Sequence, residues 1–226
     1  FYKGKLVDRN APIRVKTCGR ALKHTVHLDK VKAEQFVLPI GKKKTHVIGI
    51  NPSQITTEDL AVSLQPAANY VPTDGYSKVA AVERHHNTGK IGVAVAKGYG
   101  IRNGAVASSV SHDSHNIIVI GDNDRDMALA VDEIIRTQGG YTVVENGEVF
   151  ETLPLPIMGL MSDAGFESVN ETLGRMIKKA HEMGVPADIE PFITLSFLAL
   201  PVIPTLRITP RGLCLLTAKG PEILQE

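Results

Sequence analysis

The sequence predicts an α/β protein, a layered α+β sandwich built on a mixed sheet. Short strand-like runs recur along the 226 residues, and two longer stretches have helical periodicity. Strands and helices alternate without the strict strand–helix–strand rhythm of a parallel sheet. Because 43% of the residues are hydrophobic, the chain can fill a sizeable core. The sequence changes in character near Tyr76, so we expect a strand-rich segment over 1–75 and a main domain over 76–226.

The first 50 residues read as short strands in a turn-rich setting. The expected strands are 5–7, 13–15, 24–28, 35–40 and 46–50. Three lysines at 42–44 precede the last of these runs. We interpret them as a solvated turn rather than as a phosphate-binding patch.

From Tyr76 onward, the apolar runs become longer. Strands are expected near 76–86, 104–111 and 116–121. The run over 90–100 is interpreted as a helix that ends at a glycine.

The stretch over 123–138 is the clearest helix in the sequence. Residues 122–124 are its cap candidates, and Gly139 and Gly140 terminate it. A hairpin follows over 141–152, in which Asn146-Gly147 forms a type I′ turn because both central residues must tolerate positive φ.

A second helix is expected over 167–183. Ser168 and Glu171 have the spacing of a capping box at its start. The apolar tail over 192–216 is expected to be strand-rich, with a turn over 209–212.

Charge and cysteine content narrow the classes of function. With 25 basic and 24 acidic residues, the net charge is +1, which gives no general attraction to nucleic acid or to a membrane surface. Cys18 and Cys214 encode neither a disulfide framework nor a thiolate metal site. No apolar run reaches the roughly 18 residues that span a bilayer, so we expect a cytoplasmic protein without nucleic-acid or membrane partners. Because residue 1 is not Met, we also expect a piece of a longer protein.

Two motifs suggest phosphate chemistry, but each has a simpler explanation. The glycines over 98–104 lead into a strand, whereas a dinucleotide site needs glycines that open a helix. The acidic cluster over 121–126 is similar to the magnesium-binding segment of haloacid-dehalogenase-like phosphatases, yet the D-x-D nucleophile motif of those enzymes is missing. We therefore interpret the cluster as the cap of a helix N-terminus, which favours negative charge.

The segment Ser111–Asn116, SHDSHN, is the most unusual polar stretch. Two imidazoles, a carboxylate, two hydroxyls and an amide lie between two apolar strands, and no turn type requires two histidines. A Ser-His-Asp triad does not fit, because residues this close in an extended segment do not converge. Two interpretations stay open: a polar turn that satisfies backbone groups, or a functional loop in which His112, Asp113 and His115 hydrogen-bond a planar polar ligand or support a metal-bound water from outside its ligand set.

Metal ligation is not assigned to any residue of this sequence. His85 and His86, adjacent on a strand, would point to opposite faces, and so would His24 and His27. No spacing of histidines and carboxylates predicts a converging ligand set.

Three long phrases carry a resemblance to a known family. They are AVERHH…MALAV over 81–131, LPLPIMGLMSD over 153–163 and PFITLSFLALPVIPTLRITPRGL over 191–213. In this order they closely resemble the C-terminal domain of bacterial and archaeal adenine deaminases. The resemblance covers roughly 76–216, and 1–75 is similar to the region that joins this domain to a catalytic barrel.

That family belongs to the amidohydrolase superfamily, in which divalent metal at the mouth of a (β/α)₈ barrel supplies the attacking hydroxide. The resemblance implies hydrolysis of adenine to hypoxanthine and ammonia. The barrel's H-x-H pair and its other ligands have no counterpart in this sequence, so the catalytic barrel is expected to be absent from this chain. Manganese, iron or zinc is expected in the intact enzyme only. The expected partners are adenine, the N-terminal barrel of the same enzyme and further copies in a homo-oligomer.

The polar loops are then expected to enclose or support the active site. His112 and Asp113 are the supporting candidates for catalysis. The candidates for substrate binding are Arg84, His85, His86, Ser114, His115 and Asn116. In an extended chain His112 and His115 would lie on opposite sides, so we expect His112 with Asp113 to face substrate and His115 with Asn116 to be structural. The alternative is a non-catalytic structural or oligomerisation module.

Overall fold

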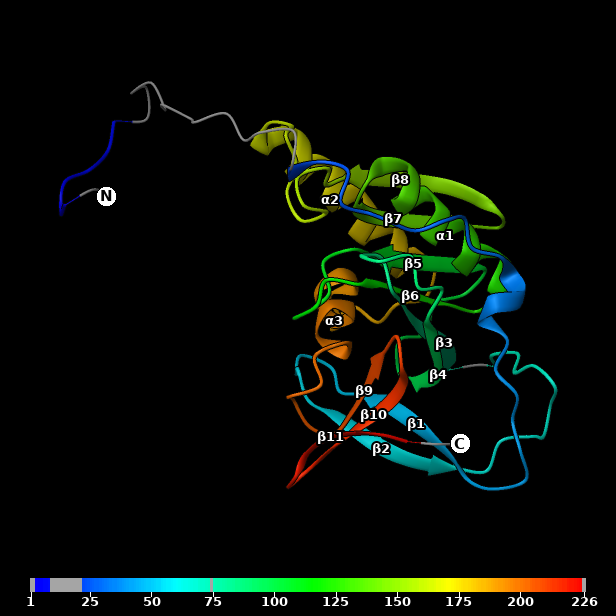
Figure 1. Cartoon of the computed structure of the whole chain (residues 1–226). Helices are drawn as coiled ribbons and strands as arrows, with labels where there is room; N and C mark the ends of the chain where they lie inside the picture. Colours follow the sequence, from blue (N-terminus) through cyan, green and yellow to red (C-terminus); the bar gives the residue numbers. More distant parts are fainter. Residues whose placement is uncertain (1–2, 9–21, 74, 225–226) are drawn as a thin grey trace.

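The computed structural model describes residues 3–8, 22–73 and 75–224. These residues form an eight-stranded sheet, a three-stranded sheet and three α-helices (Figure 1). The order of the large sheet is β2-β1-β4-β3-β6-β5-β7-β8, in which β1 and β4 run parallel and the other neighbours run antiparallel. The predicted class, a layered α/β protein on a mixed sheet, is confirmed.

The bounds of the elements are as follows. The large sheet contains β1 (Thr45–Ile50), β2 (Thr57–Val62), β3 (Tyr76–Val82), β4 (Ile91–Lys97), β5 (Gly104–Ser108), β6 (Ile117–Gly121), β7 (Gly140–Glu145) and β8 (Glu148–Pro154). The small antiparallel sheet contains β9 (Leu206–Thr209), β10 (Gly212–Thr217) and β11 (Gly220–Ile223). The helices are the 3₁₀ turn η2 (Ala33–Phe36), α1 (Asp124–Thr137), α2 (Phe166–Glu182) and α3 (Pro191–Leu198). In the described ranges, no helix has both the length and the apolar character needed to cross a membrane.

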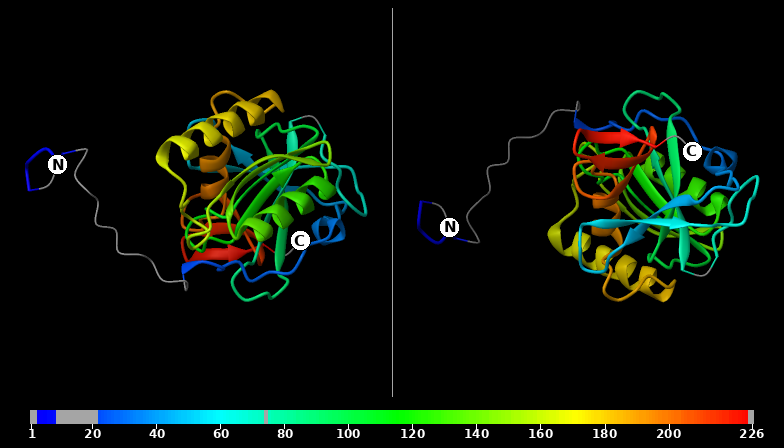
Figure 2. Two further views of the ribbon diagram at one scale, coloured as in Figure 1. Left: turned by 90° about the horizontal axis from the view of Figure 1, so that it is seen from above. Right: turned by 90° about the horizontal axis from the view of Figure 1, so that it is seen from below.

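The large sheet is covered on both faces. In β3, Val79 and Ala81 belong to a core shared with α2, α3 and the small sheet, whereas Ala80 and Val82 pack with α1. This alternation follows from the two-residue period of a strand. Figure 2 shows α1 on one side of the strands and α2 with α3 on the other.

The helix α1 and the hairpin after it agree with prediction. Asn123, one of the three cap candidates, accepts a hydrogen bond from the backbone N–H of Asp126 at 2.9 Å. The helix ends before Gly139, which has φ +116°. Asn146 and Gly147 both have positive φ between β7 and β8, as a type I′ turn requires.

The helix α2 has the expected position, but its expected capping box is wrong. The helix begins at Phe166 and its N-cap is Gly165, which offers no side chain. Ser168 and Glu171 therefore lie inside the helix. Met176 and Ala180 are buried against the large sheet, and Gly184 follows the helix with φ +108°.

The expected helix over 90–100 is wrong, because Ile91–Lys97 forms β4 in the interior of the sheet. A strand buried on both faces has a continuous apolar run, which periodicity cannot distinguish from a buried helix. Gly92 shows how closely this strand is packed. A Cβ atom there would lie 2.0 Å from the backbone oxygen of Thr209 in β9.

The tail is strand-rich only in its second half. Residues 191–198 form α3, in contrast to the expectation of a strand-rich tail over 192–216. Pro191 occupies the first turn and the Glu190 carboxylate caps the helix. The strands β9 and β10, joined by a turn at Pro210-Arg211, confirm the rest.

In the first 50 residues, one predicted strand of five is confirmed. Residues 46–50 lie in β1, but 5–7, 24–28 and 35–40 form no strand of either sheet, and 13–15 lie outside the described residues. Phe36, Leu38 and Ile40 are buried without belonging to a strand of either sheet, which explains why the apolar pattern of 35–40 led to a wrong prediction. The lysines at 42–44 are exposed, as expected. Strands β1 and β2 come from the first 75 residues, so the large sheet contains strands from both sides of the expected domain boundary. The division into two domains stays a prediction.

Candidate functional site

Two polar loops meet where β3 and β6 lie side by side. The first, the HH loop, covers 83–90 after β3, and the second, the SHDSHN loop, covers 111–116 before β6. Arg84 Nε donates to the backbone oxygen of His115, and His85 Nε2 donates to that of Ser114 at 2.7 Å. Two consecutive carbonyl groups of the SHDSHN loop are thus held by the HH loop.

The SHDSHN loop is curled rather than extended. The His115 N–H donates to the Ser111 oxygen at 2.6 Å, and the Ser111 N–H donates to His115 Nδ1 at 3.3 Å. As a result the rings of His112 and His115 lie 5.6 Å apart, edge to face. The expectation that these rings lie on opposite sides of an extended chain is wrong, because local hydrogen bonds close the loop.

A groove of about 490 Å³ runs beside the two loops. Its polar wall includes Glu83, His86, Asp113, Ser114 and Asn116. Its apolar lining includes Ala81, Ala199, Pro201, Ile208 and Cys214. A largely apolar pocket with a few convergent polar groups is the usual form of a small-molecule site.

The sequence-predicted site residues divide into two groups. His86, Asp113, Ser114 and Asn116 line the groove, and the first three are exposed. Asn116 is nearly buried and donates from Nδ2 to Ser114 Oγ at 2.9 Å, which orients that hydroxyl.

The remaining predicted residues do not line the groove. The ring of His112 packs against that of Phe197 in α3, with 5.0 Å between the ring centroids. The backbone N–H of His112 donates to the backbone oxygen of Ser196 at 2.9 Å. His85 and His115 point their ring nitrogens at the loops themselves. The groove therefore presents Asp113, rather than His112, to a ligand.

Arg84 is only 2% exposed, and its guanidinium hydrogen bonds within the described residues go to backbone oxygens and to the Thr25 hydroxyl. Beyond its bond to His115, it donates to the backbone oxygen of Thr25 at 3.1 Å and to that of Met158 at 3.0 Å. Burial lowers the pKa of this guanidinium to about 10, so it stays charged at neutral pH. Its donors serve backbone carbonyls, and we assign it the role of fixing the loops rather than binding substrate.

Glu83 is a residue of this site that the sequence did not reveal. Its carboxylate accepts hydrogen bonds from the backbone N–H groups of His85, His86 and Thr88 at 2.6, 2.9 and 3.1 Å. Burial alone would raise the pKa of this carboxyl, but these bonds outweigh burial and lower the pKa to about 2. The HH loop is thus folded around a carboxylate, which places His86 at the groove. A glutamate directly before a polar, glycine-containing loop is the signal that could have indicated this.

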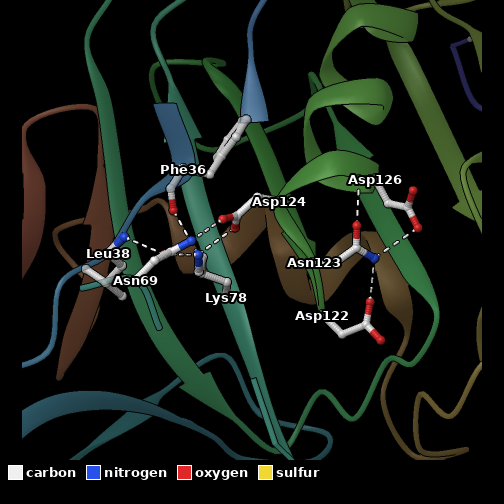
Figure 3. A network of polar contacts seen from close by, with 8 residues as sticks. All are labelled: Phe36, Leu38, Asn69, Lys78, Asp122, Asn123, Asp124 and Asp126. Atoms are coloured by element: carbon white, nitrogen blue, oxygen red, sulfur yellow. Dashed lines mark hydrogen bonds and ion pairs between the residues drawn. The ribbon is translucent and has the colours of Figure 1, made fainter. Parts of the chain in front are cut away.

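The acidic cluster over 122–126 is fully engaged within the fold (Figure 3). Asp122 accepts from the Gly104 N–H at 2.9 Å, and Asp124 pairs with Lys78 at 2.5 Å. Asp126 accepts from Asn123 Nδ2 at 3.0 Å. The interpretation of the cluster as the cap of α1 is favoured over magnesium-dependent phosphatase chemistry.

Metal ligands do not converge in the part of the chain that the structure describes. Across 3–8, 22–73 and 75–224, no three His, Cys, Asp or Glu side chains are grouped so that they could hold a metal ion. His85 and His86 lie in the loop after β3 rather than on a strand, with ring centroids 6.3 Å apart. The described residues therefore do not fit the divalent metal that the resemblance implies.

We expect His115 to titrate below the ordinary histidine pKa of 6.5. Burial disfavours its charged form, and the neighbouring His112 and Arg84 lower its pKa further. Because Nδ1 accepts the Ser111 N–H, the neutral ring with its proton on Nε2 fits the loop. The contribution of this ring to stability is complete above pH 6.5 and is lost as the pH falls from 6.5 through the lower pKa of the folded state. A ¹H–¹³C NMR titration, assigned with a His115→Gln variant, measures this pKa, and a midpoint at or above 6.5 would contradict the geometry.

Comparison with known proteins gives a consistent result. A family model described as the adenine deaminase C-terminal domain matches residues 54–219. Adenine deaminase from Desulfitobacterium hafniense is 50% identical over 215 residues, and adenine deaminase from Nitratidesulfovibrio vulgaris strain DP4 is 46% identical over 219 residues. Adenine deaminase 2 from Carboxydothermus hydrogenoformans is 41% identical over 219 residues. Each match covers 94% of this chain and 38% of the relative, so the chain spans well under half the length of these relatives.

Proposed function

Because this chain belongs to the family of adenine deaminase C-terminal domains, we propose that it is the C-terminal part of an enzyme that hydrolyses adenine to hypoxanthine and ammonia. One observation carries the role of this part. Asp113, Ser114 and His86, from two separate loops, converge on one groove with a largely apolar lining. Purine has the matching chemistry, since its faces are apolar and its edge alternates donors and acceptors.

Each polar group of the groove has a defined use toward such an edge. The Asp113 carboxylate accepts a hydrogen bond from the exocyclic amine, and the Ser114 hydroxyl donates to or accepts from a ring position. His86 can hold or release a proton near neutral pH. These residues bind and orient the purine while the apolar lining excludes water from its faces.

The chemical step itself is placed outside this chain. We propose that a catalytic barrel of the amidohydrolase superfamily, holding manganese, iron or zinc, forms the other side of the site. No step at the groove is assigned to a metal, because the described residues do not fit one. Assembly into a homo-oligomer and a cytoplasmic location stay predictions.

Alanine substitutions in the SHDSHN loop test this role in a complete enzyme that carries these 226 residues. We expect Asp113→Ala to lower kcat/KM by roughly tenfold or more, about 1.4 kcal/mol, because it removes a contact to the reacting purine. His112→Ala and His115→Ala are expected to lower kcat/KM by unequal amounts. His115 supports the loop, whereas His112 touches α3. Steady-state ammonia release per folded molecule and thermal unfolding are measured together.

Glu148→Ala is the matched control, because Glu148 is an exposed carboxylate in the β7–β8 hairpin, away from the groove. Its kcat/KM should not change. If the loop variants lose thermal stability while turnover per folded molecule is unchanged, the loop is scaffolding. That outcome would support the alternative, a structural or oligomerisation module, which the buried contacts of Arg84 favour.

A further inference from the structure

The helix α3 is apolar on every side, although one side faces solvent. Its sequence is PFITLSFL, and Ser196 and Thr194 are its only polar residues. Phe192, Leu195 and Leu198 are buried in the core, whereas Ile193 is 57% exposed. A helix with apolar residues all round is typical of one that is buried on all sides. The sequence of α3 is therefore that of a covered helix.

A groove of about 280 Å³ lies along the exposed side of α3. The segment between β1 and β2 forms its opposite wall, which includes Ile55, 49% exposed. Ile193 and Phe197 contribute the α3 wall. Asp188 and Glu190 make one rim acidic. An apolar segment with a basic or N–H-bearing flank fits this combination.

Two residues of α3 link this groove to the SHDSHN loop and to the residue before it. The ring of Phe197 contacts that of His112, and Ser196 Oγ donates to the backbone oxygen of Val110 at 2.5 Å. After α3, Ala199 and Pro201 line the other groove, the one of about 490 Å³ that Asp113 also lines. A polypeptide segment bound to the exposed side of α3 therefore lies next to the candidate site.

We infer that the exposed side of α3 and its groove seat an apolar segment of the polypeptide that precedes this domain in a full-length adenine deaminase. The inference rests on the proposed function. The relatives have more than half of their length outside the matched region, and the family is a C-terminal domain, so a large body of chain is available to cover α3. A second copy fits less well, because a two-fold interface would bring each acidic rim near its own copy.

Thiol labelling tests whether a polypeptide segment covers the exposed side of α3. Ile193→Cys is made in a Cys18→Ser background, both in the 226-residue chain and in a full-length adenine deaminase that ends in this domain. Lys178→Cys, on α2 at a side chain that is 80% exposed, is the matched control. Thr194→Cys is a second probe in the same groove. Rates of reaction with a maleimide are compared between the two proteins.

We expect the thiols at 193 and 194 to react about tenfold or more slowly in the full-length protein, because covered thiols lose access to the reagent. The thiol at 178 should react at the same rate in both. Equal rates at 193 in both proteins would overturn the inference. Protection that appears in the 226-residue chain alone and rises with concentration would also overturn it, in favour of a second copy.

Deaminase activity is measured on the same full-length samples, so the two proposals fail separately. An active enzyme with an unprotected thiol at 193 removes the docking surface but leaves the proposed function intact. An inactive enzyme with a protected thiol keeps the docking surface and counts against the proposed function.

Discussion

Purified alone, the 226-residue chain is expected to release no ammonia from adenine, with or without added manganese, iron or zinc. Hydrolytic deamination in the amidohydrolase superfamily, to which we propose the intact enzyme belongs, uses an activated water, and the described residues hold no group of ligands that could bind a metal to activate it. In the proposed function the groove beside the SHDSHN loop contributes hydrogen bonds to a purine edge, whereas the attacking water is activated by another part of the enzyme. Binding without chemistry is therefore the expected behaviour.

The measurement is ammonia release from adenine by a preparation of verified intact mass, after incubation with each metal in turn. A full-length adenine deaminase carrying the same 226 residues is the positive control. Metal-dependent turnover by the short chain would contradict the assignment of catalysis to another part of the enzyme. The Asp113→Ala variant would then show whether that turnover uses this groove.

The local elements of the fold could be read from sequence because their signals are local. The cap at Asn123, the glycine at 139 and the Asn146-Gly147 turn each depend on the conformation of one or two residues. β4 and α3 could not be distinguished in the same way. Both are continuous apolar runs, and only their neighbours decide between strand and helix. Gly92 in β4 tolerates the close approach of β9, a requirement that no local pattern reveals.

Only part of the polar lining of the groove could be named from the sequence, and its shape could not. The two histidines around Asp113 indicated an unusual SHDSHN loop. The curled conformation that brings their rings together depends on hydrogen bonds between Ser111 and His115, four residues apart. The apolar lining comes partly from β9 and from residues after α3, far away in sequence. Arg84 was expected to bind substrate together with the polar loops, but its side chain is buried. Its burial depends on carbonyl groups of Thr25 and Met158 that only the folded chain brings near.

Lys78→Met is expected to have the largest effect on stability of any substitution considered for this chain. The Lys78 ammonium is fully buried and donates to the Phe36 oxygen at 2.9 Å, to Asn69 Oδ1 at 2.9 Å and to Asp124 Oδ1 at 2.5 Å (Figure 3). Burial lowers the pKa of this ammonium below its ordinary value of 10.5, and Asp124 opposes part of that shift. Methionine fills a similar volume but donates to none of the three acceptors, and of these Asn69 Oδ1 keeps a hydrogen bond from the Leu38 N–H at 3.0 Å.

We expect the free energy of unfolding to fall by about 3 kcal/mol or more, the usual result of removing one partner of a buried ion pair. Urea denaturation followed by circular dichroism measures it. Lys178→Met is the control, because that exposed lysine has only a 3.8 Å pair with Glu182, and its variant should differ by no more than about 0.5 kcal/mol. A Lys78→Met variant as stable as this control would show that the network contributes little.

The double variant Lys78→Met, Asp124→Leu separates the ion pair from the rest of the network. Asp124 also accepts a hydrogen bond from Asn69 Nδ2 at 2.7 Å, so some cost remains after both charges are removed. Because the double variant no longer leaves an unpaired carboxylate near the core, we expect it to be destabilised by less than the sum of the two single variants, with a coupling of about 1 kcal/mol or more. Strict additivity would mean that Lys78 acts through the Phe36 and Asn69 oxygens alone. In that case the attachment of the segment before β1 to the N-terminus of α1 depends on hydrogen bonds from the ammonium to uncharged oxygens rather than on the ion pair.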